Sequence, residues 1–211
     1  MAKVDNKASN TQIMQMHSMK RKHGVVGKIE DIDLGCTDII MYQSSKCLNV
    51  ADPNKLPLVI RPNPDDAHLT SDPDVDGQIM IKLTFRDPVS LTALVIRATK
   101  APSQDDIKKA FDDEEVDEEH TPSEPRLIKL FANKPELDFT DAEEIAAAQQ
   151  IVLKPKQLKG DKIQLKALKF QRCTSVQIFF VDNQKGTEFT YVNRIGIIGR
   201  LAKAYHTEYG Q

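Results

Sequence analysis

Apolar and polar residues alternate between Gln78 and Phe85, and this alternation constrains the fold more than any other feature of the sequence. Neighbouring side chains of a β-strand point to opposite faces of a sheet, so residues two positions apart share a face. One face would carry the large apolar residues Ile79, Ile81, Leu83 and Phe85. The opposite face would carry Met80, Lys82 and Thr84. The pattern predicts a strand with one buried face.

Further segments of strand length occur along the chain. Asp87 and Pro88 are expected to end the first strand, and the β-branched residues 89–98 to form a second strand after a short turn. Other apolar runs of this kind are residues 58–60, 127–132, 151–154, 162–170, 175–181 and 189–198. Roughly seven or eight short strands separated by Pro, Gly and Asn turns are typical of an antiparallel β-sandwich or barrel.

Two local features add detail to the predicted sheet. Within residues 162–170 the apolar side chains change parity once, which predicts a β-bulge near Ala167. These apolar residues are Ile163, Leu165, Ala167, Leu168 and Phe170. Residues 182–186, DNQKG, tolerate positive φ, so we expect the strands on either side of them to pair as a hairpin.

Two segments are expected to be helical. Residues 140–150 are rich in Ala and Glu, and Thr140 and Glu143 match the T-x-x-E pattern of a capping box. A second short helix is predicted over residues 103–111. It leads directly into the acidic block of residues 112–119, DDEEVDEE, whose like charges repel one another.

We therefore interpret residues 103–124 as an exposed acidic loop inserted between two strands. Two roles are open for this loop: an electrostatic arm for a basic partner, or a loop that only adds solubility. Around it the sequence predicts a mobile N-terminal arm (residues 1–24), one β-domain (residues 25–200) and a C-terminal tail (residues 201–211). The 211 residues, 40% of them hydrophobic, suffice for one core, and we expect a monomer.

Charge and hydropathy exclude several classes of partner. The formal charge of -2 lacks the basic excess that neutralises a phosphate backbone, so nucleic acid is not an expected partner. The first ten residues lack the apolar core of a secretory signal, and no window approaches the roughly 18 apolar residues of a membrane span. We expect a cytoplasmic protein without membrane contact. The cluster at residues 20–23, KRKH, is either a nuclear import patch or part of a solvated tail.

Common catalytic and metal-binding patterns are absent from the sequence. Cys36, Cys47 and Cys173 are an odd number at unrelated spacings, which indicates reduced thiols and neither a disulfide framework nor a zinc cluster. Cys173 precedes an apolar strand and is expected to be buried. The five histidines are scattered, and no nucleophile elbow, Walker loop or dinucleotide fingerprint occurs. We therefore expect no enzyme, no cofactor and no metal.

One acidic segment matches part of a calcium-binding loop. Asp72, Asp74, Asp76 and Gly77 reproduce the opening D-x-D-x-D-G of that loop. The twelfth position, which needs a bidentate Glu, is Leu83, and the residues after Gly77 alternate like a strand. An acidic turn that leads into a strand is the preferred interpretation, and ion binding by the three carboxylates stays open.

Several segments together resemble the PITH domain family. They are residues 47–49 (CLN), 71–91 (SDPDVDGQIMIKLTFRDPVSL), 126–139 (RLIKLFANKPELDF), 168–179 (LKFQRCTSVQIF) and 191–199 (YVNRIGIIG). In order and spacing they cover roughly residues 30–200. The resemblance implies an all-β, antiparallel jelly-roll β-sandwich similar to galactose-binding-like folds, with one or two short helices. It also implies association with the proteasome, and it carries over no catalytic residues.

The first hypothesis for function is therefore a non-catalytic protein-interaction module that docks on proteasome subunits or a related complex. Candidate contacts are loop residues, among which an aromatic side chain can anchor a partner. They are Lys134, Phe139, Asp182, Asn183 and Gln184. The alternative is a jelly-roll module that binds a small ligand or carbohydrate, although the chain has no Trp and only four Tyr to offer as a platform.

Overall fold

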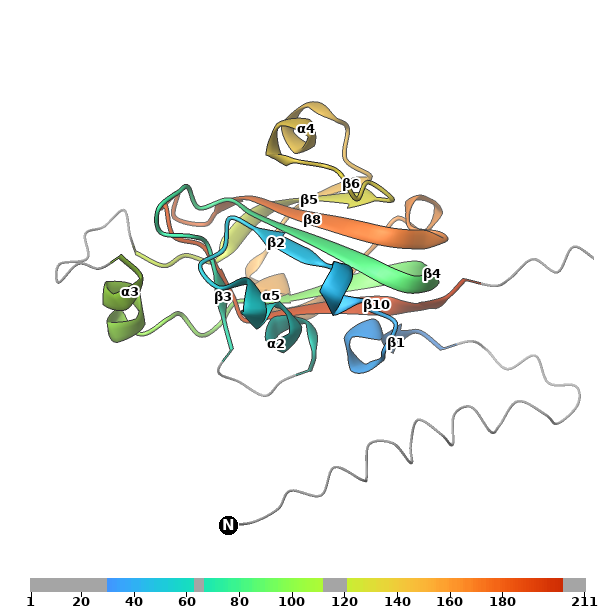
Figure 1. Cartoon of the computed structure of the whole chain (residues 1–211), viewed down its shortest axis with the longest axis horizontal. Helices are drawn as coiled ribbons and strands as arrows, with labels where there is room; N and C mark the ends of the chain where they lie inside the picture. The colour runs from blue at the N-terminus through green and yellow to red at the C-terminus, as the bar shows by residue number, and fades with distance from the viewer. Residues whose placement is uncertain (1–29, 63–66, 112–120, 203–211) are drawn as a thin grey trace, which may run out of the picture. The chain divides into compact units, whose positions relative to one another are not determined.

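The computed structural model describes residues 30–62, 67–111 and 121–202 (Figure 1). The expected N-terminal arm, the acidic block and most of the C-terminal tail lie outside these residues. The strands are β1 (Ile32–Asp33), β2 (Lys46–Leu48), β3 (Leu69–Thr70), β4 (Ile79–Arg97), β5 (Pro125–Ala132), β6 (Gln149–Val152), β7 (Lys159–Gln164), β8 (Cys173–Asn183), β9 (Tyr191–Val192) and β10 (Arg194–Leu201). The α-helices are α2 (Leu56–Ile60), α3 (Gln104–Phe111), α4 (Phe139–Glu144) and α5 (Pro155–Leu158), and the 3-10 helices are η1 (Leu34–Cys36), η2 (Tyr42–Ser44), η3 (Pro53–Lys55) and η4 (Ala167–Lys169).

Most of the strands form two layers that share β4 (Figure 1). The first half of β4 pairs with β2 on one side and β8 on the other, and β5 and β6 continue that layer. The second half of β4 pairs with β10 and β7, and β1 completes the second layer beside β10. Every one of these pairs is antiparallel, and β3 and β9 form a separate antiparallel pair. The predicted all-β antiparallel sandwich is confirmed.

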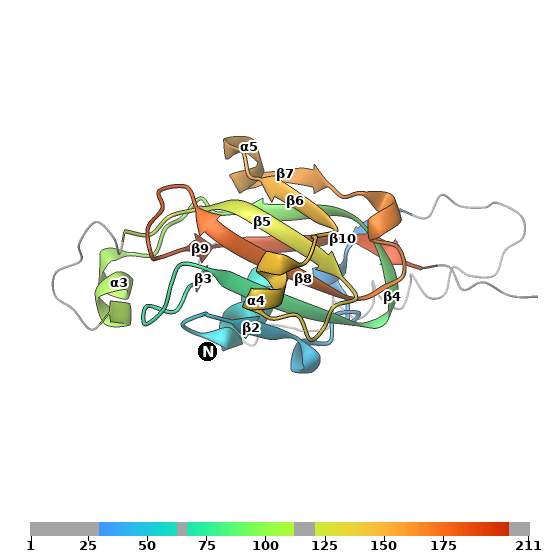
Figure 2. The ribbon, with the colours of Figure 1, turned by 90° about the horizontal axis from the view of Figure 1, so that it is seen from above.

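The core between the layers is filled by the alternating residues of the longer strands. Ile79, Ile81 and Leu83 of β4 are fully buried there, as the alternation predicts, and Phe180 of β8 joins them. Met80 points to the opposite face but is also buried, because α4 covers that outer face (Figure 2). The first layer therefore has apolar side chains on both faces.

β4 does not end at Asp87 and Pro88, so the expected break between two strands is wrong. The register of β4 against β8 shifts between Thr84 and Val89, and the strand changes its partners there. Proline lacks an N–H and is tolerated where the ladder of hydrogen bonds is interrupted. The carbonyl oxygen of Pro88 accepts from the N–H of Ala202 at 2.8 Å. The two residues mark a bend at which one strand passes from the first layer to the second.

A second irregularity of β4 lies opposite β10. The register shifts between Ile198 and Gly199, so that Leu91 and Leu94 both face the core although they are three residues apart. A Cβ atom on Gly199 would lie 2.5 Å from the carbonyl oxygen of Ser90. Only glycine permits this close approach of the two backbones.

The predicted bulge near Ala167 is wrong, because the chain leaves the sheet before that residue. β7 ends at Gln164, and the N–H of Lys169 donates to the carbonyl oxygen of Lys166 at 2.8 Å in the turn of η4. The change of parity in the sequence marks this exit from the sheet. Leu168 is consequently 87% exposed instead of facing the core.

Two further expectations about strands are wrong. Residues 58–60 lie in helix α2, which has Pro57 in its first turn, where a missing N–H costs nothing. The turn at residues 182–186 is present, with Gly186 at a φ of 73°. The strands on either side of it do not form a hairpin, because β8 pairs with β4 and β5, β9 with β3, and β10 with β4 and β1.

Helix α4 lies where residues 140–150 are predicted to be helical, but it starts earlier and is shorter. Its N-cap is Asp138 and not Thr140: the Asp138 carboxylate accepts from the N–H of Asp141 at 2.8 Å. The helix ends at Glu144, and the last two residues of the predicted helix already belong to β6. The prediction of a helix is confirmed and that of its cap is wrong.

The acidic insertion is anchored at both ends. The expected helix over residues 103–111 is α3, and its Ile107 is 1% exposed. Ser123 is fully buried, and its hydroxyl accepts from the N–H of Lys185 at 3.1 Å. The interpretation of all of residues 103–124 as an exposed loop is therefore wrong at its two ends, while the acidic block lies outside the described residues.

Phe180→Ala is expected to lower the free energy of unfolding by about 3–5 kcal/mol, because it leaves a cavity between the layers. Leu168→Ala is the control, and removal of this exposed side chain should change that free energy by less than about 0.5 kcal/mol. Urea unfolding followed by circular dichroism measures both values. Similar losses in the two variants would contradict the placement of Phe180 in the core.

Candidate functional site

Asn183 organises the loop that follows β8. Its Nδ2 donates to the carbonyl oxygen of Thr187 at 2.7 Å and to Oγ1 of Thr190 at 3.0 Å. Its Oδ1 accepts from the N–H of Gly186 at 2.8 Å and from that of Thr187 at 3.0 Å. The residue is 3% exposed, so it shapes the loop from within.

Asp182 and Gln184 connect the same loop to β5. The Asp182 carboxylate forms an ion pair with Arg126 and accepts from the N–H of Leu127 at 3.0 Å. Gln184 is exposed, and its Nε2 donates to the carbonyl oxygen of Pro125 at 3.0 Å. These polar side chains hold the loop against the first layer, and Gln184 also faces solvent.

Phe139 and Lys134 lie near α4, on the outer side of the first layer. The ring of Phe139 packs edge-to-face on Phe179 of β8, with the ring centroids 5.6 Å apart. This contact belongs to the smaller apolar cluster beneath α4. Lys134 is exposed, and its N–H donates to Oε1 of buried Gln177 at 3.1 Å. Phe139 thus contributes to packing, whereas the side chain of Lys134 is accessible.

The structure spreads the five predicted contact residues along β8 and does not bring them together. β5 and β8 are antiparallel, with Ala132 opposite Val176 and Pro125 opposite Asn183. Lys134 follows the first pair and therefore lies near the start of β8, while Phe139 contacts the middle of that strand. Asp182, Asn183 and Gln184 lie at its end. No single site contains all five.

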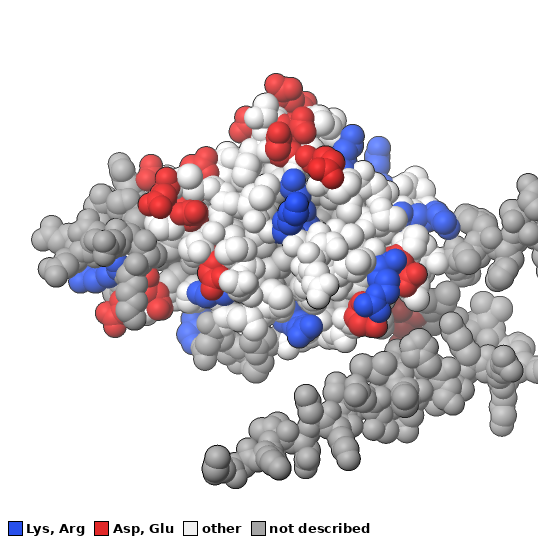
Figure 3. Space-filling view, in the orientation of Figure 1, with Lys and Arg blue, Asp and Glu red and all other residues white. Residues whose placement is uncertain are grey.

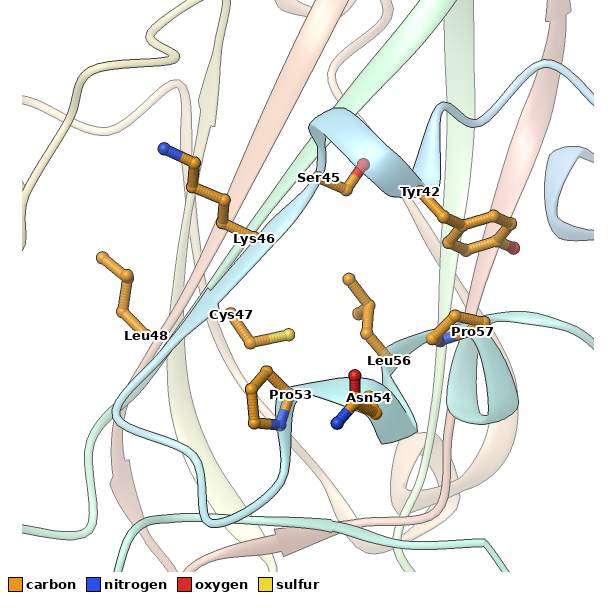
Figure 4. A pocket seen from close by; sticks show the side chains of 9 residues that line it. All are labelled: Tyr42, Ser45, Lys46, Cys47, Leu48, Pro53, Asn54, Leu56 and Pro57. Carbon is orange, nitrogen blue, oxygen red and sulfur yellow. The ribbon is translucent and has the colours of Figure 1, made fainter.

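A pocket that the sequence interpretation missed lies beside β2, and its volume is about 370 Å³ (Figure 4). Residues 42–57 supply its whole lining: Tyr42, Ser45, Lys46, Cys47, Leu48, Pro53, Asn54, Leu56 and Pro57. In Figure 4 the sulfur of Cys47 points towards the middle of the pocket. The sequence signal is weak, because these residues show no regular alternation, and only the resemblance of residues 47–49 points to this segment.

The aromatic ring of Tyr42 lines one side of this pocket and contacts a guanidinium group outside the lining. The guanidinium carbon of Arg61 lies 5.1 Å from the centroid of the Tyr42 ring, within the range of a cation–π interaction. Burial raises the pKa of Tyr42, and the nearby Arg61 partly offsets that effect. The phenol therefore stays protonated at neutral pH.

The three thiols are held in their protonated form. Burial raises the pKa of Cys47 to about 12 and that of Cys173 to about 11. The pKa of Cys36 is raised by burial and then by the carboxylate of Asp33. Since the thiolate is the nucleophile and the metal ligand, these shifts leave each thiol weakly reactive. Cys173 is fully buried, as predicted.

The carboxylates of the calcium-like segment hold a turn. Oδ1 of Asp72 accepts from the N–H of Asp74 at 3.1 Å, and Oδ1 of Asp76 accepts from Nδ2 of Asn49 at 2.9 Å. Within residues 30–62, 67–111 and 121–202, no three His, Cys, Asp or Glu side chains are grouped so that they could hold a metal ion. In the same part of the chain no helix has the length and apolar character needed to cross a membrane.

Solved structures of other proteins share this two-layer architecture. The F5/8 type C domain of a Bacteroides fragilis protein superposes with a TM-score of 0.50 at 12% identity, over 83% of this chain and 99% of that chain. A family 32 carbohydrate-binding module (CBM32) from a family 31 glycoside hydrolase of Clostridium perfringens superposes with a TM-score of 0.51 at 7% identity, over 84% and 100%. At such low identity the likeness establishes only the fold. The chain is a jelly-roll β-sandwich of the galactose-binding-like class.

Sequence similarity identifies the family within this class. Residues 33–209 match the model of the PITH domain. The chain is also 31% identical over 157 residues to Thioredoxin-like protein 1 of Schizosaccharomyces pombe, and the match covers 73% of this chain and 47% of that protein. The chain belongs to the PITH domain family, and it spans about half the length of this curated relative.

Iodoacetamide is expected to alkylate Cys47 and Cys173 in the folded protein at least about ten times more slowly than free cysteine at pH 7.5. With pKa values of about 12 and about 11, their thiolate fractions lie below about one in a thousand. Mass spectrometry of the labelled peptides gives the rates. Urea-unfolded protein is the control and should react like free cysteine; rapid labelling of the folded protein would contradict the assignment of weakly reactive thiols.

Proposed function

We propose that this chain is a protein-interaction module that associates with the proteasome or a related protein complex and performs no catalytic step. The observation that carries the proposal is the match of residues 33–209 to the PITH domain, since the resemblance to that family implies association with the proteasome. The jelly-roll fold hosts many functions and does not by itself select one. The weakly reactive thiols support binding without covalent chemistry.

The distribution of charge supports contact with another macromolecule. In Figure 3 acidic side chains gather over α4, whereas Lys and Arg are spread over this face, several of them towards the right-hand end of the sandwich, where acidic side chains also lie. The acidic residues at α4 include Asp138, Asp141, Glu143 and Glu144. Opposite charges on two surfaces steer their encounter and suppress wrong partners. An uneven distribution of charge favours binding to a larger assembly in one orientation.

The predicted contact residues take different parts in this proposal. Lys134 and Gln184 are exposed and are candidates for direct contact. Asn183 and Asp182 would act by shaping the loop after β8, and Phe139 by holding α4 in place. A location in the cytoplasm, entry into the nucleus and a monomeric state remain parts of the proposal that rest on the sequence.

Affinity purification of the full chain from cell lysate, followed by mass spectrometry, is expected to recover proteasome subunits. Replacing each Asp and Glu of residues 112–119 by Asn and Gln should lower the yield at low salt if the acidic block steers a basic partner. Deletion of residues 103–124 is a poorer test, because it also removes buried Ile107 and Ser123.

The matched control for this experiment is Glu143→Gln with Glu144→Gln, which removes charge from α4 and leaves the acidic block intact. If the native chain, the variant of residues 112–119 and this control all recover the same subunits in equal yield, the acidic block serves solubility alone. Reproducible capture of other partners without proteasome subunits would contradict the proposed function.

The pocket beside β2 is the observation that favours the second candidate, a small-ligand or carbohydrate-binding module. Its volume of about 370 Å³ lies at the lower end of ligand sites, which span roughly 300–1,000 Å³. Ser45 and Asn54 offer polar groups there, beside the ring of Tyr42, whereas the Lys46 side chain points away from the pocket in Figure 4. Raised pKa values leave both Cys47 and Tyr42 uncharged in this site.

Thermal unfolding with a panel of mono- and disaccharides separates the two candidates. Under the proposed function we expect no rise in Tm, because a ligand stabilises the fold only when it binds the native state. Asn54→Ala, which alters the pocket, is the comparison variant, and Lys46→Ala, whose side chain points away from the pocket in Figure 4, is the control. A rise in Tm that Asn54→Ala abolishes and Lys46→Ala retains would establish the second candidate instead.

A further inference from the structure

Leu168 projects from the surface at the end of the sandwich where β4 bends. At 87% it is the most exposed large hydrophobic residue among those that the structure describes. It occupies the middle of η4, between Lys166 and Lys169, and both lysines are also exposed. Single exposed apolar residues are common and need no function. The residues around Leu168 are therefore needed to decide whether this side chain has a function.

The turn that presents Leu168 is fixed on both sides. Before it, the N–H of Lys166 donates to Oε1 of Gln149 at 2.8 Å, which ties the turn to the start of β6. After it, Phe170 is fully buried, and its carbonyl oxygen accepts from the N–H of Leu91 at 2.9 Å. The backbone of a fixed turn loses little conformational entropy when a partner binds, so only the rotamer freedom of the Leu168 side chain is lost.

Lys134 joins Lys166 and Lys169 at the same end of the molecule. Oδ1 of Asn133 accepts from the N–H of Thr174 at 2.8 Å, so the turn that contains Lys134 adjoins the start of β8, just after η4. We call Lys134, Lys166 and Lys169 the lysine rim. The exposed acids of the neighbouring segments include Asp87, Glu136 and Asp138. Figure 3 shows several blue side chains and some red ones towards this end of the molecule, and mostly red ones over α4.

We infer that Leu168 inserts into an apolar hollow of a partner protein and that the lysine rim pairs with carboxylates around that hollow. A buried apolar anchor surrounded by a polar rim is the usual arrangement of a binding hot spot. This inference rests on the proposed interaction function and names the surface that performs it. It also places Lys134, a contact residue predicted from the sequence, in the proposed docking surface.

A protein surface fits this end of the molecule better than a lipid surface. Stable anchoring to a membrane needs more buried apolar area than one leucine supplies. The acidic side chains over α4 would in addition be repelled by anionic lipids. A hollow in a protein, in contrast, can bury a single leucine completely.

Titration of the full chain against purified proteasome particles tests the inference. Leu168→Ala is expected to raise Kd at least about tenfold, because the anchor is lost. Lys166→Glu with Lys169→Glu should raise Kd by a similar factor at about 0.05 M NaCl and by less at about 0.3 M NaCl, where charges are screened more strongly. Circular dichroism checks that each variant retains its fold.

Matched controls come from the same chain. Leu58→Ala truncates another exposed leucine, 48% exposed on α2, and should leave Kd unchanged. Lys156→Glu with Lys159→Glu reverses two charges near the start of β7, away from the lysine rim, and should raise Kd far less than the rim variant.

The possible results distinguish a failure of the inferred docking surface from a failure of the proposed function. If the native chain binds and Leu168→Ala binds equally well, this surface is not the docking surface, although the proposed function stands. If the native chain does not bind proteasome particles, the proposed function falls and the inference falls with it. Binding to vesicles of phosphatidylserine and phosphatidylcholine that Leu168→Ala abolishes, without binding to the particles, would overturn the inference in favour of a lipid surface.

Discussion

The apolar alternation of β4 continues across a bend, and both layers of the sandwich depend on it. The 19 residues of this strand lie between β2 and β8 in the first half and between β7 and β10 in the second. Ile81 and Ile96, on opposite sides of the bend, consequently share one core. An isolated sheet would leave those faces in water, so the stability of each layer depends on the other. The irregularities at Pro88 and Gly199 are the local adjustments that make this geometry possible.

The buried faces of the strands are predictable from the sequence because the period of two depends only on the residues of one strand. Pairing partners are not, since they depend on distant segments: the turn at residues 182–186 suits a hairpin, yet the following β9 pairs with β3. Asp138 and Thr140 are both suitable caps in the sequence. In the structure Asp138 takes that position, and Phe139, the next residue, packs on Phe179.

The candidate surfaces were only partly predictable for the same reason. Lys134 is exposed, as a polar loop residue should be, but the sequence does not show that it lies at the same end as Lys166. Leu168 is apolar, so the sequence alone suggests a buried residue. It is exposed because the chain leaves the sheet after β7 ends at Gln164. The pocket beside β2 is built from one short irregular segment that has no periodic signal. Functional surfaces of this kind arise from tertiary contacts and not from local pattern.

The pairing of β1 with β10 joins the two extremes of the domain, with Ile32 opposite Gly199, and an ion pair between Asp33 and Arg194 lies beside it. During synthesis β4 leaves the ribosome before β7 and about 100 residues before β10, the two strands that pair with its second half, because the chain emerges in order. One edge of the second half of β4 therefore stays unpaired until almost all residues of the domain have been made. A domain with such long-range strand pairing folds slowly. Its exposed apolar surface and unpaired strand edge are prone to aggregation until β10 has been made.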